Sequence, residues 1–176
     1  MTSTVDDLQS PLHGMTISSL PADVYLEATR SEDDIGVLLR SYFLVECACE
    51  NLCKVLYHDY AKLQHDSLSK HLRALRALGM TAAAFRMADV VSKHRGPSAH
   101  VRARSITAEH VAELNAQSSG VLNVPGTLLK IGQVQTTEGQ TISITTAPVR
   151  IQYAVLSMTC AGAIDYMAEL RKPVAA

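Results

Sequence analysis

The clearest periodic pattern in the chain lies between residues 34 and 57, where apolar residues recur at steps of three and four. This spacing places them on one face of an α-helix, as is typical of a helix with one buried stripe. Ser31 is followed by three acids, a combination that favours a helix start. The pattern predicts a helix from about Asp34 to Tyr57. Its inward residues are Ile35, Leu38, Leu39, Tyr42, Val45, Cys49, Leu52, Cys53 and Leu56.

Two further helices follow, separated by a glycine turn. Asp66 or Ser67 caps the second helix, and Gly79 is its expected C-cap. The third helix starts at Thr81 and is expected to end near Gly96-Pro97, because proline disfavours a helical conformation in the residue before it. The inward residues are Leu68, Leu72 and Leu75 in the second helix, and Ala84, Met87, Ala88 and Val91 in the third.

The last third of the chain mixes strand and helix patterns. A fourth helix begins at Thr107 and is closed by Gly120. The segments TLLKIGQV and QTISITTA, in which β-branched residues alternate with polar ones, predict a β-hairpin at about residues 127–147. A last helix, from about Val149 to Arg171, is apolar around most of its circumference, which indicates a central position or a dimer interface.

These elements predict a mainly α fold, a helical bundle with a small β-hairpin insertion before the last helix. Residues 1–19 are rich in Ser, Thr and Pro and predict a flexible N-terminal arm, while residues 20–176 form a single helical domain that opens with a short helix at about 22–29. A chain of 176 residues has the length of one ordinary domain.

Composition indicates a cytoplasmic protein. The N-terminus has neither the basic nor the apolar region of a signal peptide, and no apolar run is long enough for a membrane span. The four cysteines lack zinc-site spacing, so we expect them to be buried, reduced side chains. They are Cys47, Cys49, Cys53 and Cys160.

The net charge of −1 hides an uneven distribution. Residues 1–66 hold 11 acids and 4 bases, a balance of −7, whereas residues 67–108 hold 8 bases and 1 acid, a balance of +7. Residues 109–176, with 5 acids and 4 bases, contribute −1. The basic segment 67–108 is a candidate surface for nucleic acid (RNA or DNA) if the fold gathers its bases on one face, and a set of solvated helix faces if it does not.

Familiar catalytic and phosphate-binding motifs are absent: the sequence has no P-loop, GxGxxG, GxSxG or HExxH element. No convincing helix-turn-helix is present either. The pairs His58-Asp59 and His65-Asp66 are possible hard-metal ligands, but nothing specifies the further ligands that such a site needs. We therefore interpret them as a polar connection between helices, and predict neither a metal site nor a cofactor.

The stretch KHRGPSAH, residues 93–100, carries the strongest candidate chemistry. Arg95 can hold a phosphate with two donors, and His100 can exchange a proton near neutral pH. RNA cleavage by its own 2′-hydroxyl needs both functions. Lys93, Arg102 and Arg104 are further candidates for contacts with nucleic acid. The alternative is a helix end at which the basic residues 93–95 complement the helix dipole.

Three segments, in order, resemble the mannitol operon repressor family. They are the acidic start and amphipathic helix SEDDIGVLLRSYFLVECACENLCKVL, the segment LSKHLRALRALGM with its Ala-Leu-Gly end, and KHRGPSAH, which matches the family's IRNxxAH motif at Arg95, Ala99 and His100. The resemblance covers roughly residues 32–112. It also places the chain near the HEPN superfamily of helical domains, which commonly dimerise.

The resemblance implies roles for two residues. Many HEPN members are metal-independent ribonucleases. If this chain works in the same way, the resemblance implies that Arg95 binds the scissile phosphate and that His100 acts as general acid/base. The family's asparagine is replaced here by Gly96, followed by Pro97, which removes a polar site residue.

Three hypotheses about function follow. The first is a non-catalytic regulatory protein that acts on transcription or through a protein partner. We expect it to be a homodimer that does not bind a membrane. The second is a toxin-like, HEPN-type ribonuclease that uses Arg95 and His100. The third is a structural module in which the last helix forms an obligate dimer.

Overall fold

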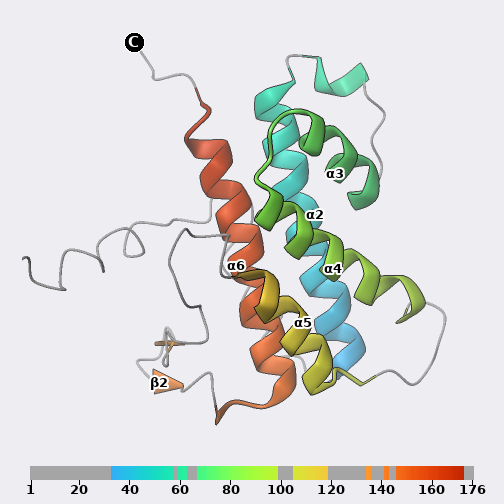
Figure 1. Ribbon diagram of the computed structural model, residues 1–176, viewed down its shortest axis with the longest axis vertical. Coiled ribbons are helices and arrows are strands. Elements are labelled where there is room, and N and C mark those ends of the chain that lie inside the picture. The colour runs from blue at the N-terminus through green and yellow to red at the C-terminus, as the bar shows by residue number, and fades with distance from the viewer. Residues whose placement is uncertain are drawn as a thin grey trace, which may run out of the picture.

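The computed structural model describes residues 33–57, 59–62, 67–98, 105–118, 134–135, 141–142 and 146–172, and within them the protein is a bundle of helices (Figure 1). The α-helices are α2 (Asp34–Leu56), α3 (Leu68–Ala77), α4 (Ala82–Ser98), α5 (Ala108–Ser118) and α6 (Val149–Glu169), and a short 3-10 helix, η2 (Tyr60–Lys62), follows α2. The predicted helical bundle is therefore confirmed. The predicted arm at 1–19 and short helix at 22–29 lie outside the described residues.

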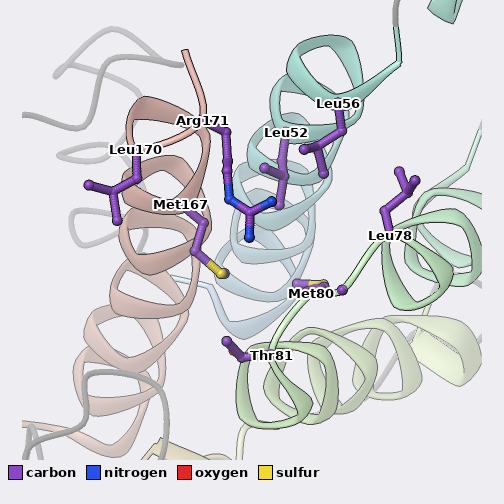
Figure 2. Close-up of a pocket in the computed structure, with 9 residues that line it drawn as sticks. Leu52, Leu56, Leu78, Met80, Thr81, Met167, Leu170 and Arg171 are labelled. Atoms are coloured by element: carbon purple, nitrogen blue, oxygen red, sulfur yellow. The ribbon is translucent and has the colours of Figure 1, made fainter. Parts of the chain in front are cut away.

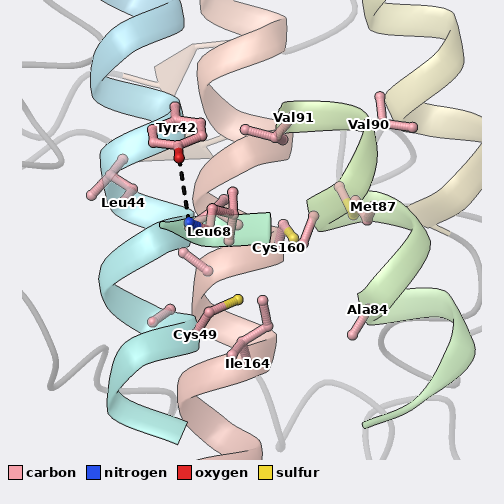
Figure 3. Packing of buried hydrophobic residues seen from close by; sticks show 14 of the residues in the cluster. Tyr42, Leu44, Cys49, Leu68, Ala84, Met87, Val90, Val91, Cys160 and Ile164 are labelled. Atoms are coloured by element: carbon pink, nitrogen blue, oxygen red, sulfur yellow. Dashed lines mark hydrogen bonds between the residues drawn. The ribbon is translucent and has the colours of Figure 1, made fainter. Parts of the chain in front are cut away.

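Helices α2 and α6 form the centre of the bundle. They run side by side in the same direction (Figure 1), and their interface is the most extensive in the described fold. Helices α3 and α4 pack against α2, and α5 packs against α4 and α6. Fully buried residues from four helices meet in the core (Figure 3), among them Leu44, Cys49, Leu68, Met87, Cys160 and Ile164. The apolar character of α6 is explained by this central position, as predicted.

The ends of α2 follow the predicted pattern. The Asp33 carboxylate caps the helix by accepting from the Gly36 N–H. The next residue, Asp34, accepts from the Ile106 N–H at 2.8 Å and so ties the chain before α5 to the first turn of α2. The helix ends at Leu56, one residue before the predicted end.

A glycine cap joins α3 to α4. Gly79 adopts a φ of +88°, a left-handed conformation that costs glycine little because it has no Cβ. The Met80 N–H donates to the Leu75 carbonyl at 2.9 Å, and the Gly79 N–H donates to the Arg76 carbonyl at 3.4 Å. This pair of bonds is the Schellman arrangement, which satisfies carbonyls at the end of α3. The predicted cap at Gly79 is confirmed.

Two helix ends differ in detail from the prediction. Helix α4 ends at Ser98, close to the predicted end near Gly96-Pro97, but it continues through the proline where a stop before it was expected. Proline lacks an N–H, yet a final turn tolerates one lost bond more easily than a helix interior. Helix α5 ends at Ser118, and the predicted closing Gly120 lies outside the described residues.

The predicted hairpin is not supported at its expected size. Strands β1 (Val134–Gln135) and β2 (Thr141–Ile142) pair antiparallel, with Val134 opposite Ile142, but each contains only two residues. Most of the segment 127–147 lies outside the described residues. The described part therefore shows a short ladder and not the predicted hairpin of two full strands.

Candidate functional site

Arg95 occupies the junction between α4 and α2. Its guanidinium carbon lies 4.4 Å from the centroid of the Tyr42 ring, within the range of a cation–π contact. The side chain is half-buried, and its Nε is buried with no hydrogen-bond partner among the described residues. The arginine of the candidate motif is therefore held by an aromatic face, while the donor at Nε remains unused.

The Tyr42 hydroxyl continues this junction to α3. It donates to Glu46 Oε1 at 3.1 Å, and the Leu68 N–H donates to the same carboxylate oxygen at 2.9 Å and to the Tyr42 hydroxyl at 3.4 Å (Figure 3). Ser67, the N-cap residue, makes no side-chain capping bond, so Glu46 takes its place at the start of α3. Burial and the nearby Glu46 carboxylate raise the pKa of Tyr42, so its hydroxyl stays protonated near neutral pH.

This arrangement can bind an anion, but in the described residues it does not assemble a proton-transfer pair. A guanidinium is suited to a phosphate or carboxylate, although the Nε of Arg95 is itself buried and not accessible to one. The other motif residues, Ala99 and His100, lie outside the described residues. Arg102 and Arg104 lie outside them too, so the structure neither joins these groups to Arg95 nor separates them from it.

Lys93, the remaining predicted nucleic-acid contact, is exposed and paired within its own helix. Its Nζ lies 2.7 Å from Asp89 Oδ2, one turn earlier in α4. The hydrogen bond to Asp89 and the charge of that carboxylate raise the pKa of Lys93. An exposed pair of this kind is weak, so Lys93 can exchange its partner for a phosphate at little cost.

Other bases of the segment 67–108 fold onto neighbouring side chains. The Arg76 guanidinium lies 5.2 Å from the centroid of the Phe85 ring, which joins α3 to α4. Arg86 Nε donates to Gln117 Oε1 at 3.0 Å, which joins α4 to α5. These positive charges therefore contribute to helix packing as well as to the surface potential.

His94 forms a buried polar network that the sequence analysis did not identify. Its Nε2 lies 3.0 Å from Glu113 Oε2 on α5, and its Nδ1 lies 3.2 Å from the Tyr153 hydroxyl on α6. The His110 ring lies beside it, with a centroid distance of 4.5 Å. The sequence analysis placed His94 only among the basic residues near the end of its helix, whereas its side chain is 7% exposed and faces the core.

The chemistry of the partners assigns the protons in this network. A carboxylate only accepts, so His94 Nε2 carries a proton toward Glu113. In the neutral imidazole Nδ1 then accepts from the Tyr153 hydroxyl. Burial raises the pKa of Tyr153 strongly, which keeps this donor protonated. Tyr153 is fully buried in the core and Glu113 is exposed at the surface, so the network is a polar connection among α4, α5 and α6 that runs from the surface to the core.

His94 has a signal in the sequence. It lies three residues after Val91 and seven after Met87, so it continues the inward stripe of its helix. A histidine on such a stripe needs buried partners. Its partners on α5 and α6 are 19 and 59 residues away, and no local pattern names them.

The possible metal ligands near η2 stay untested. His58, His65 and Asp66 lie outside the described residues. In the part of the chain that the structure describes, no three His, Cys, Asp or Glu side chains gather as a metal site would require. Nearby, the Tyr60 hydroxyl and His71 Nε2 share a hydrogen bond of 2.8 Å.

The cysteines confirm the prediction of buried thiols at three of four positions. Cys49, Cys53 and Cys160 are buried, Cys47 is half-buried, and all four are free. Burial raises the pKa of Cys47 to about 11 and that of Cys53 and Cys160 to about 12. These thiols therefore pack as small apolar groups and have little nucleophilic character near neutral pH.

Comparison of the chain with family models, curated proteins and solved structures finds no match. The resemblance to mannitol operon repressors therefore rests on the sequence segments alone. Over the described residues, no helix combines the length and hydropathy needed to cross a membrane.

Proposed function

We propose that the protein is a non-catalytic cytoplasmic regulatory protein of the mannitol operon repressor type. It acts on transcription or through a protein partner, as a homodimer. The observation that carries this proposal is the position of Arg95, which packs on Tyr42 at the junction of α2, α3 and α4. An arginine in this position has a structural reason to be present without any catalytic role.

Exposed apolar side chains support action through a protein surface. Leu39 and Phe43 lie one turn apart on α2 and are 41% and 49% exposed. Tyr166 in α6 and Leu170, the residue directly after the helix, are also exposed. Large apolar side chains in such pairs are typical of surfaces that contact another protein or a second copy of the chain.

Transcript measurements in the host test the regulatory role. The gene would be deleted and then restored as wild type or as His100→Ala. A regulator that needs no catalysis changes the level of a defined set of transcripts, and both versions restore it. Restoration by wild type alone, together with new cleaved RNA ends, would contradict the proposal.

A second measurement tests the dimer. Sedimentation of the purified chain is expected to show a dimer at micromolar concentration. Sedimentation of the double variant Leu39→Ser/Phe43→Ser and of the matched variant Tyr166→Ser/Leu170→Ser then shows which exposed pair forms the dimer interface. The variant that sediments as a monomer identifies that pair. If the wild-type chain is a monomer, the regulatory protein does not act as a homodimer. The hypothesis of a structural module with an obligate dimer would then be wrong as well.

One observation favours a HEPN-type, metal-independent ribonuclease as the second candidate. The Tyr42 ring holds the Arg95 guanidinium in place, as a preorganised phosphate-binding group requires. In this candidate function Arg95 binds the scissile phosphate and His100 transfers the proton. Incubation of the purified protein with RNA in a chelator tests it, with Arg95→Lys, His100→Ala and, as a control, Lys93→Gln. Cleavage that both motif variants lose and the control retains would establish the nuclease.

A further inference from the structure

An apolar groove opens at the end of the bundle where α2 and α6 finish. The loop between α3 and α4 closes its other side (Figure 2). Its volume is about 130 Å³, and its walls include Leu52 and Leu56 from α2, Met167 from α6, and Leu78 and Met80 from the loop. No acidic side chain lines it. Its α2 residues, Leu52 and Leu56, lie about three and four helical turns beyond Tyr42, so the groove is separate from the Arg95 junction.

Arg171 provides the positive charge at this groove. Figure 2 shows its side chain extending from the end of α6 toward Leu52, with the guanidinium beside Met167. The acid in the last turn of α6, Glu169, pairs with Lys172 at 2.5 Å. Within the described residues no carboxylate pairs with Arg171, so its charge faces the apolar walls.

We propose that this groove binds a small monocarboxylate with an apolar body, such as an aromatic or branched aliphatic acid. The apolar part lies between the side chains of Leu52, Met80 and Met167, and the carboxylate accepts two hydrogen bonds from Arg171. Planar guanidinium and carboxylate groups fit each other in this paired geometry. A volume near 130 Å³ suits one benzene-sized group, since an apolar cavity of about 150 Å³ accepts benzene.

The same walls argue against other classes of ligand. A sugar or polyol would bury several hydroxyls that need partners, and among the described lining residues only Thr81 offers a side-chain hydroxyl, which is too few to satisfy them. A cation would be repelled by Arg171. The groove is thus complementary to a ligand with one negative charge and an apolar remainder.

Benzoate is the probe for the test, with the neutral benzyl alcohol and the cationic benzylamine beside it. Methyl NMR of the methionines in the full-length protein reports on Met80 and Met167 directly. Arg171→Gln removes the charge at an exposed position, and Lys172→Gln is its matched control with the same change of net charge. Leu78→Phe narrows the groove without altering charge, and circular dichroism checks that each variant is folded.

We expect saturable benzoate-dependent shifts of the Met80 and Met167 methyls. Affinity should fall about tenfold in Arg171→Gln, as for loss of a charge-assisted contact, and stay within about twofold in Lys172→Gln. Benzyl alcohol and benzylamine should bind more weakly, and Leu78→Phe should weaken all three. Absence of saturable shifts, equal affinity in Arg171→Gln, or shifts confined to other methionines would each overturn the proposal. The assay uses purified protein alone, so its outcome is independent of the transcript test of regulation.

Discussion

The Arg95 guanidinium lies over the Tyr42 ring, 4.4 Å from its centroid, and this contact joins the first and the last segments of the resemblance in space. Tyr42 belongs to the first long helix and Arg95 to the KHRGPSAH stretch, 53 residues later (95 − 42). The Tyr42 hydroxyl then reaches the start of α3. The three segments quoted for the resemblance therefore meet at one point of the fold.

A double-mutant cycle measures the strength of this contact. Arg95→Met and Tyr42→Leu each remove one partner, and we expect a coupling of about 0.5–2 kcal/mol in the free energy of urea unfolding. Tyr42→Phe keeps the ring but loses the hydroxyl, so its coupling to Arg95 should remain. Additive effects of Arg95→Met and Tyr42→Leu would show that the stacking contributes nothing to stability.

Glu46 is expected to cap α3 in place of Ser67. Glu46→Ala removes the acceptor for the Leu68 N–H and should lower the free energy of unfolding by about 0.5–2 kcal/mol, the usual value of an N-cap. Ser67→Asp adds a local cap and should recover most of this loss in the Glu46→Ala background. If Ser67→Asp gives no recovery, Glu46 acts through something other than capping.

Gly79 is needed for its backbone conformation and not for space. A Cβ built at Gly79 meets no atom within 4 Å, so Gly79→Ala introduces no clash. The left-handed φ of +88° should still cost about 1–2 kcal/mol of unfolding free energy. Gly79→Asn should cost less, because asparagine tolerates this region better. Equal losses for Ala and Asn in thermal unfolding would contradict this explanation.

The helices were predictable because their signals are local. The apolar stripes of α2, α3 and α4, the acids before α2 and the glycine after α3 lie within a few residues of the structure that they determine. The inward residues Ala84, Met87, Ala88 and Val91 are all buried. In the first helix, by contrast, Leu39 was predicted to face inward but is 41% exposed. Steps of three and four also select residues at the border of the buried face, and Leu39 is one of these.

The candidate site was less predictable because its contacts are not local. The sequence named Arg95 but not its partner Tyr42, and it assigned His94 to a helix end. Neither the Tyr42 ring nor the pairing of His94 with Glu113 and Tyr153 has a fixed spacing in sequence, since each depends on how the helices cross. The groove at Arg171 has no sequence motif either, because three separate segments form it.

Thiol reactivity tests the burial of the cysteines. At about pH 8 a thiol with a pKa near 11 is ionised in only about one molecule in a thousand, so folded protein should react slowly with a disulfide reagent. All four thiols should react quickly after unfolding in denaturant. Cys47 is the half-buried one, and Cys47→Ser should remove any fast phase of the folded protein. Fast labelling that survives in Cys47→Ser would show that a buried thiol is accessible.

Tyr153 should make the fold sensitive to alkali. Burial raises its pKa above the ordinary 10.0, so the unfolded chain loses this proton at a lower pH than the folded one. The stabilisation is complete below about pH 10 and is lost as the pH rises through the folded pKa. Tyr153→Phe removes this dependence and also the hydrogen bond to His94, which costs about 1 kcal/mol near pH 8.

The measurement is the free energy of unfolding at about pH 8 and about pH 11. At the lower pH, the free energy of unfolding of Tyr153→Phe should be smaller than that of wild type. Between the two pH values it should decrease less than that of wild type. Tyr166→Phe is the matched control, because it removes the same hydroxyl from a side chain that is 49% exposed, and it should follow wild type at both values. Parallel losses in wild type and Tyr153→Phe would mean that another group causes the alkaline unfolding.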